Sequence, residues 1–249
     1  MNYDKIFSME SIDKQKEDEY FVFIRLYKAE YKDPTNICHV IDKTITAAND
    51  SAIDNMFYNH VAMNYKLTDD YMGLTLSGET SLKYEKCTKT DDNKYMAGCD
   101  DKKSIYSVYS IKVKKNEYQR IIKLLNNHEE IKKFKYSVLS LVKLLGGIIE
   151  AKKREVSVEN INLPFKIFND ENGFCCSTMV AYILEKCAPS VSNKVKLKVS
   201  DYSKITPSGL TKVLPDCNIL FGGKWANYNK DLEKFLKINP SFNKFVEVL

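Results

Sequence analysis

A cysteine stands directly after a turn signal and directly before an apolar run with helical spacing. The segment reads Gly173-Phe174-Cys175-Cys176-Ser177-Thr178 and continues from Met179 to Leu184. A thiol at the start of a helix lies at the positive end of the helix dipole, which favours the reactive thiolate. We therefore expect Cys176 to be a nucleophile whose backbone N–H helps to hold an oxyanion. The alternative is that Cys175 and Cys176 are small core residues.

A histidine stands at the head of a second short apolar run, Asn59-His60-Val61-Ala62-Met63, which predicts a strand. The chain has three histidines. His39 lies beside Cys38 on a short predicted helix, and His128 lies at an exposed helix end. His60 is therefore the expected general base for Cys176. The alternative is an ordinary polar residue at the start of a strand.

A third polar group is expected to orient the imidazole through its other ring nitrogen. Glu85 is the residue we select for this role, and Thr75, Ser77 and Glu79 on the strand after His60 are the alternatives. The sequence does not choose among these four residues. A surface carboxylate is the alternative interpretation of Glu85.

Composition limits the class of protein. The 249 residues are 44% hydrophobic, enough for a core, and no apolar run is long enough to cross a bilayer. No signal peptide is visible at the N-terminus, so a cytosolic location is expected. Seven cysteines, an odd number, argue against a disulfide framework, and their spacing matches no common zinc module.

Partners are constrained by charge and by missing motifs. The net charge of +5 comes from basic and acidic residues that are mixed along the chain, so no specific nucleic-acid partner is expected. Neither Gly146-Gly147 nor Gly222-Gly223 has the spacing of a phosphate-binding loop, and no cofactor is expected. Lysines interleaved with aromatics (Phe235, Lys237, Phe242, Lys244) raise a weaker possibility of contact with anionic lipid, but an ordinary solvated helix face is the preferred interpretation.

The order of the elements favours an α+β fold, because strands and helices are mixed without regular βαβ alternation. Strands are expected at 20–27, 57–65, 71–76, 82–87 and 104–113, the last with clean alternation. Helices are expected at 37–48, after a cap at Asn116, at 137–145, from Cys176, and at a short start within 203–210. Residues 88–103 and 150–172 are expected to be loops. The segment 232–245 is expected to be broken at Pro240.

These segments resemble the permuted NlpC/P60 group of papain-like thiol hydrolases, near its YiiX/YycO-like branch. The resemblance rests on an ordered set of motifs over residues 20–210 rather than on any one of them. The motifs are Phe57 to Met63, Ile105 to Val113, Glu117-Tyr118, Cys176 to Leu184 and Ile205 to Leu210. Gly209 stands where the family usually has an acidic residue.

The resemblance implies an antiparallel sheet packed against helices, with Cys176 as nucleophile and His60 as base. It divides the chain into a lead-in at 1–19, a permuted domain at 20–210 and an extension at 211–249 packed on the same domain. The implied activity is hydrolysis of an amide, a peptide or isopeptide, or an acyl-ester bond through an acyl-enzyme. The alternative is an inactive structural or binding protein on the same fold, associated with a virus particle and with viral or host proteins as partners.

Overall fold

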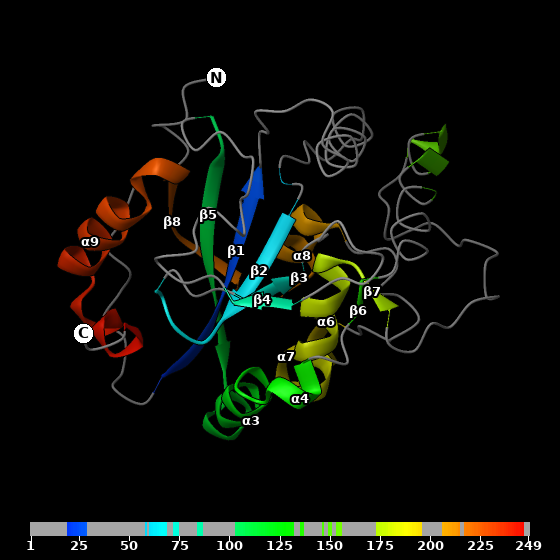
Figure 1. The fold of residues 1–249 in the computed structure, drawn as a ribbon, viewed down its shortest axis with the longest axis horizontal. Helices are drawn as coiled ribbons and strands as arrows, with labels where there is room; N and C mark the ends of the chain where they lie inside the picture. Colours follow the sequence, from blue (N-terminus) through cyan, green and yellow to red (C-terminus); the bar gives the residue numbers. More distant parts are fainter. Residues whose placement is uncertain are drawn as a thin grey trace.

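The computed structural model of the chain describes residues 19–28, 58, 60–68, 72–74, 84–86, 103–131, 135–136, 146, 149–150, 153–155, 173–195, 206–214 and 217–246. Within these ranges the fold is a mixed α+β arrangement of an antiparallel sheet with helices on both faces (Figure 1). The antiparallel sheet and its packed helices were expected from the sequence.

Six strands form the central sheet in the order β4-β3-β2-β1-β5-β8, and all neighbours are antiparallel. Their bounds are β1 (Tyr20–Lys28), β2 (His60–Asn64), β3 (Met72–Leu74), β4 (Tyr84–Lys86), β5 (Ile105–Val113) and β8 (Cys217–Lys224). A separate parallel pair joins β6 (Lys135–Tyr136) to β7 (Gly173–Phe174). The long central pairing of β1 with β5 covers all nine residues of each strand.

Both faces of the sheet are covered, and β1 shows this directly in its sequence. Successive side chains of a strand point to opposite faces. The even residues Val22, Ile24 and Leu26 belong to one apolar core, and the odd residues Phe21, Phe23 and Tyr27 belong to another. Every residue from 21 to 27 is buried as a result.

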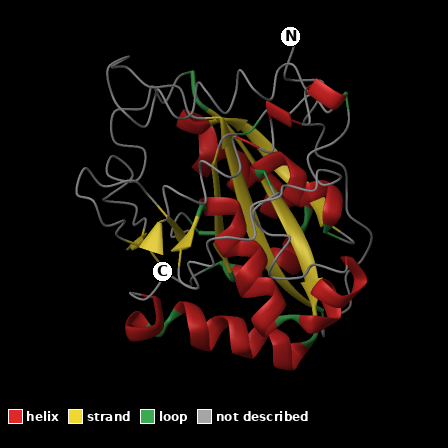
Figure 2. Ribbon diagram, turned by 90° about the vertical axis from the view of Figure 1, so that its right-hand side faces the viewer, coloured by secondary structure: helices red, strands yellow, loops and turns green. Residues whose placement is uncertain are grey.

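The first core, here called the cysteine-side core, lies between the sheet and four helices. They are α3 (Lys115–Leu125), α6 (Cys176–Cys187), α7 (Pro189–Val195) and α8 (Pro207–Val213), with the short α4 (His128–Ile131) beside α3. Figure 2 looks onto this side, with helices in front of the strands. The residues that β2, α6 and α8 contribute to this core include Val61, Met63, Cys176, Met179, Val180, Ile183, Leu184, Leu210 and Leu214, the last directly after α8.

The second core, here called the aromatic core, lies on the opposite face beneath α9 (Tyr228–Ile238). The 3-10 turns η4 (Trp225–Asn227) and η5 (Pro240–Phe245) flank this helix. Rings pack edge-on or tilted, for example Phe235 against Phe242 at 5.0 Å between centroids. Its other main members are Phe21, Phe23, Tyr27, Tyr106, Phe221, Trp225, Tyr228 and Phe245. The expected domain boundary after residue 210 falls inside α8, and β8 and α9 belong to this sheet and its cover.

The strand and helix predictions agree well with the described elements, apart from their bounds. Each of the five predicted strands overlaps a strand of the sheet, and the cysteine helix begins at Cys176 as predicted, but β8 was not predicted. Pro240 begins η5 two residues after the end of α9. The cap predicted at Asn116 is wrong. The helix begins at Lys115 with Lys114 as its N-cap, whose backbone N–H donates to Glu117 three residues later. The helices predicted at 37–48 and 137–145 lie outside the described residues.

Candidate functional site

The start of α6 holds Cys176 at the first helical position, as the sequence predicted. Cys175 is the N-cap, with extended backbone at φ −97° and ψ 173°. Its N–H donates to the hydroxyl of Thr178 at 2.8 Å, and that hydroxyl donates to the Cys175 carbonyl at 3.1 Å. Thr178 therefore fixes the first turn, and Cys176 lies at the positive end of the dipole of a twelve-residue helix.

Cys176 itself is nearly enclosed. Its exposed fraction is 8%, and it is a member of the cysteine-side core with the Val61 and Met63 side chains of β2. Cys175 is 2% exposed, and its sulfur lies 3.4 Å from the Ser177 hydroxyl. Among the described cysteines, Cys175, Cys176, Cys187 and Cys217 are free thiols.

His60 lies at the first position of β2, as predicted, but on the other side of the sheet from Cys176. Its register partner is Tyr27, and paired residues of antiparallel strands share a face. Tyr27 belongs to the aromatic core, and the two rings have centroids 5.9 Å apart. The β2 residues that face α6 are Val61 and Met63. The structure therefore does not bring the two halves of the expected dyad together.

Burial and a neighbouring buried arginine together determine the protonation of His60. Arg25 is completely buried, and its guanidinium carbon lies 4.5 Å from the ring centroid of Trp225 and 4.7 Å from that of Tyr228. Burial, and then the positive charge of Arg25, lower the pKa of His60 to about 4. The imidazole is therefore neutral at physiological pH, and it is a weak proton acceptor there.

The third polar residue is not placed. Glu85 lies on the edge strand β4 opposite Gly73 of β3, two strands away from β2, which carries His60, and its side chain lies outside the description. Thr75, Ser77 and Glu79 lie outside the described residues, as does His39. His128 begins α4, and its side chain also lies outside the description.

A pair of hydroxyls on the cysteine side was missed by the sequence analysis. The Ser107 hydroxyl donates to the Tyr58 hydroxyl at 2.6 Å, and Tyr58 packs against the cysteine-side core. Burial raises the pKa of Tyr58, so its hydroxyl stays neutral. The available signal was the alternation predicted for residues 104–113, which puts Ser107 and Tyr109 on one face of their strand. No local pattern in the sequence predicts that Tyr58, 49 positions before Ser107, lies against that face of the strand.

Arg25 was also missed, although a signal for it exists. A single arginine inside the apolar and aromatic run of residues 20–27 must be satisfied within the core, because a buried charge without favourable contacts is costly. Three rings supply such contacts, with Tyr27 the third at 5.1 Å.

The aromatic residues of the C-terminal segment do not support the alternative of lipid contact. Phe235 and Phe242 are completely buried in the aromatic core, so these rings do not meet a membrane. Lys237 and Lys244 are exposed. The aromatic side chains of this segment therefore pack against the sheet, and its lysines face the solvent, as expected for an amphipathic segment.

The described residues bring no metal-binding group of three His, Cys, Asp or Glu side chains together. No helix of the described part combines the length and the apolar character needed to cross a bilayer. The chain matches no known protein family, no curated protein and no solved structure.

Proposed function

We propose that this protein acts by binding a partner, and that its cysteine helix serves a permuted papain-like fold as a structural element. The observation that carries the proposal is the placement of Cys176 and His60 on opposite faces of one sheet. A dyad needs the thiol and the imidazole within hydrogen-bond reach, and a two-sided sheet with both faces covered separates them.

The surroundings of both residues support the same function. Cys176 is packed among aliphatic side chains of β2 and α6, where an acyl substrate has little access to its sulfur. His60 packs on Tyr27 beside a cation, and a pKa near 4 suits a neutral packing residue better than a proton shuttle at neutral pH.

The papain-like part of the proposal rests on the ordered motifs together with the coarse architecture. An antiparallel sheet carries the histidine strand β2, and the cysteine helix packs against that strand. The cytosolic location expected from the sequence and the virus-particle association suggested by the resemblance both form part of the proposal. Viral or host proteins are the partners that the resemblance suggests.

A cysteine hydrolase is the second candidate, and one observation favours it. Cys176 occupies the first position of a long, well-fixed helix, which is a setting that lowers thiol pKa values in general. Its sulfur would attack the carbonyl of an amide, peptide, isopeptide or acyl ester and form a thioester as the C–N or C–O bond breaks and the protonated amine or alcohol leaves. Water would then hydrolyse the thioester, which releases the acid and restores the thiol. This version requires a base other than His60.

Alkylation by iodoacetamide separates the candidates when it is measured against pH and the modified cysteine is located by mass spectrometry. The proteins compared are the wild type, His60→Ala, and Cys176→Ala as the site control. Our proposal predicts slow labelling of Cys176 that follows ordinary thiol ionisation near about 8.5 or above and ignores His60.

The other outcomes are equally specific. Fast labelling of Cys176 at pH 6 that persists in His60→Ala would favour the hydrolase with a helix-activated thiolate. Fast labelling that His60→Ala abolishes would restore the dyad and contradict both the opposite-face arrangement and the binding proposal.

A further inference from the structure

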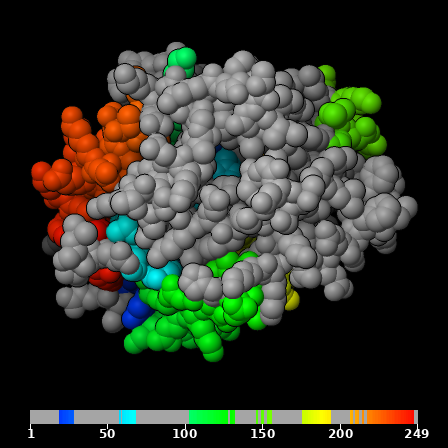
Figure 3. All heavy atoms as spheres, viewed as in Figure 1, coloured from blue at the N-terminus to red at the C-terminus, as the bar shows by residue number. Residues whose placement is uncertain are grey.

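A lysine-rich surface covers the outer side of α9 and the turns beside it. Five lysines are exposed there: Lys224, Lys230, Lys234, Lys237 and Lys244. Figure 3 shows α9, in orange, along the left edge of the molecule, where its atoms form part of the outer surface. We call these five residues the lysine surface.

The lysine surface is held on a rigid support. Lys230, Lys234 and Lys237 recur at helical spacing, so their side chains lie along one side of α9. Leu232 and Phe235 of the same helix are buried in the aromatic core. The cations therefore project from a fixed helix, so little ordering entropy opposes docking on a partner.

Acidic residues do little to cancel this charge. Residues 217–246 contain five lysines and two carboxylates, Asp231 and Glu233. Asp231 accepts a hydrogen bond from the Tyr106 hydroxyl at 2.9 Å and so engages a residue of the aromatic core. Burial raises the pKa of Asp231, and the positive charges of Lys234 and Lys230 oppose this rise because they favour the ionised form. Glu233 is exposed. A positive excess remains on the outer side.

We propose that the lysine surface docks on a membrane leaflet that carries anionic headgroups. Lysines near such a surface each contribute about 1 kcal/mol of attraction. Ile238, which follows Lys237 in the sequence, is 46% exposed. Burial of its apolar side chain at a lipid interface would strengthen binding. The proposal is independent of Cys176 and holds whether or not the protein is a hydrolase.

A nucleic acid fits this surface less well. Proteins read or stack on bases with arginine and exposed aromatic rings. Residues 217–246 contain no arginine. Their six aromatic residues are all buried: Phe221, Trp225, Tyr228, Phe235, Phe242 and Phe245. The exposed side chain of Ile238 can form neither a hydrogen bond nor an ion pair with a phosphate backbone.

The test is co-sedimentation of the full chain with vesicles of phosphatidylcholine, with and without phosphatidylserine, at low and high salt. The wild type is expected to bind only the anionic vesicles, and high salt is expected to release it. Lys230→Glu/Lys234→Glu/Lys237→Glu is expected to lower the partition coefficient by about a hundredfold or more. The matched control, Lys115→Glu/Lys123→Glu/Lys186→Glu, makes the same charge change at exposed positions on α3 and α6 and is expected to retain most binding.

Ile238→Ser distinguishes the lipid from other anionic partners. It is expected to weaken vesicle binding severalfold while leaving the salt dependence unchanged. Circular dichroism verifies the fold of every variant. Three results would overturn the proposal: no binding to anionic vesicles, equal loss in both triple variants, or binding to duplex DNA with no binding to vesicles.

Discussion

The imidazole of His60 lies against the ring of Tyr27, its partner across β1 and β2, with ring centroids 5.9 Å apart. This contact shows which face of the sheet His60 occupies, because successive side chains of a strand point to opposite faces. The neighbour of His60, Val61, points toward α6 and Cys176. The histidine therefore faces the aromatic core, and its protonation is governed first by burial and then by the charge of Arg25.

The first prediction concerns the titration of His60. In the folded protein its pKa is expected near about 4, against an ordinary value of 6.5, because burial and Arg25 disfavour the imidazolium. Two-dimensional NMR of the ring protons measures this directly. In Arg25→Met the pKa is expected to rise but to stay below 6.5, since burial persists. A wild-type value at or above 6.5 would contradict the packing described for the ring.

The same shift has a consequence for stability. The folded pKa of His60 is depressed, so its contribution is complete above pH 6.5 and is lost as the pH falls through about 4. Between these pH values the imidazole is protonated in the unfolded chain but neutral in the folded chain, so protonation stabilises the unfolded state. His60→Phe is expected to flatten this part of the stability curve, measured by urea unfolding at several pH values.

The second prediction concerns Arg25, whose guanidinium is surrounded by three aromatic rings. Arg25→Ala leaves a cavity among Tyr27, Trp225 and Tyr228 and is expected to cost about 2–5 kcal/mol of unfolding free energy. Arg25→Met keeps most of the volume and removes a buried charge, so its cost is expected to be less than about 1.5 kcal/mol. Equal costs would show that the charge, rather than the packing, matters.

The main strands and the cysteine helix could be predicted because each carries a local signal. The alternation of residues 104–113 gives β5, and the turn before Cys176 gives the start of α6. The run of residues 20–27 predicts a strand, although it is buried on both faces and so shows no alternation of polarity.

The pairing of Cys176 with His60 could not be derived from such signals. Each residue was placed correctly on its own element, but the face that His60 occupies depends on its register with β1. That register is a long-range property, because β1 and β2 are separated by more than thirty residues of sequence. The hydrogen bond between Tyr58 and Ser107 is hidden for the same reason.

The third prediction concerns Thr178, which closes the first turn of α6. Thr178→Val keeps the shape but removes the acceptor of the Cys175 N–H, and a cost of about 1 kcal/mol is expected. Hydrogen exchange at the Cys175 amide is expected to become faster. Thr206→Ala, which removes the N-cap of α8 that accepts from Gly209 at 2.9 Å, is the matched control and leaves that amide unchanged.

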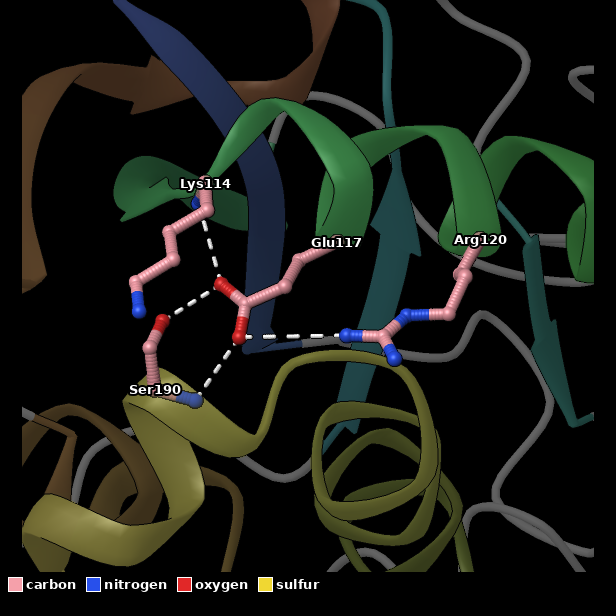
Figure 4. Close-up of polar contacts among 4 residues, drawn as sticks. All are labelled: Lys114, Glu117, Arg120 and Ser190. Atoms are coloured by element: carbon pink, nitrogen blue, oxygen red, sulfur yellow. Dashed lines mark hydrogen bonds and ion pairs between the residues drawn. The ribbon is translucent and has the colours of Figure 1, made fainter.

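The fourth prediction concerns Glu117, which joins α3 to α7 (Figure 4). Its carboxylate accepts from the Lys114 N–H at 2.9 Å, from the Ser190 N–H at 2.8 Å, and from the Ser190 hydroxyl. Burial opposes its ionisation, but these hydrogen bonds prevail and hold its pKa below the ordinary 4.5. Arg120, at 4.0 Å and half exposed, adds little.

Glu117→Gln places an amide NH₂ against N–H or O–H donors and is expected to cost about 1.5–3 kcal/mol at neutral pH. Because the folded pKa is depressed, this contribution is present above about pH 4.5 and is lost as the pH falls through the folded value. Urea unfolding is therefore expected to show a gap between wild type and variant that closes in acid. A double-mutant cycle with Ser190→Ala isolates the shared hydrogen bond. A gap that stays constant down to pH 3 would show that the cost comes from altered packing and that ionised Glu117 does not hold the two helices together.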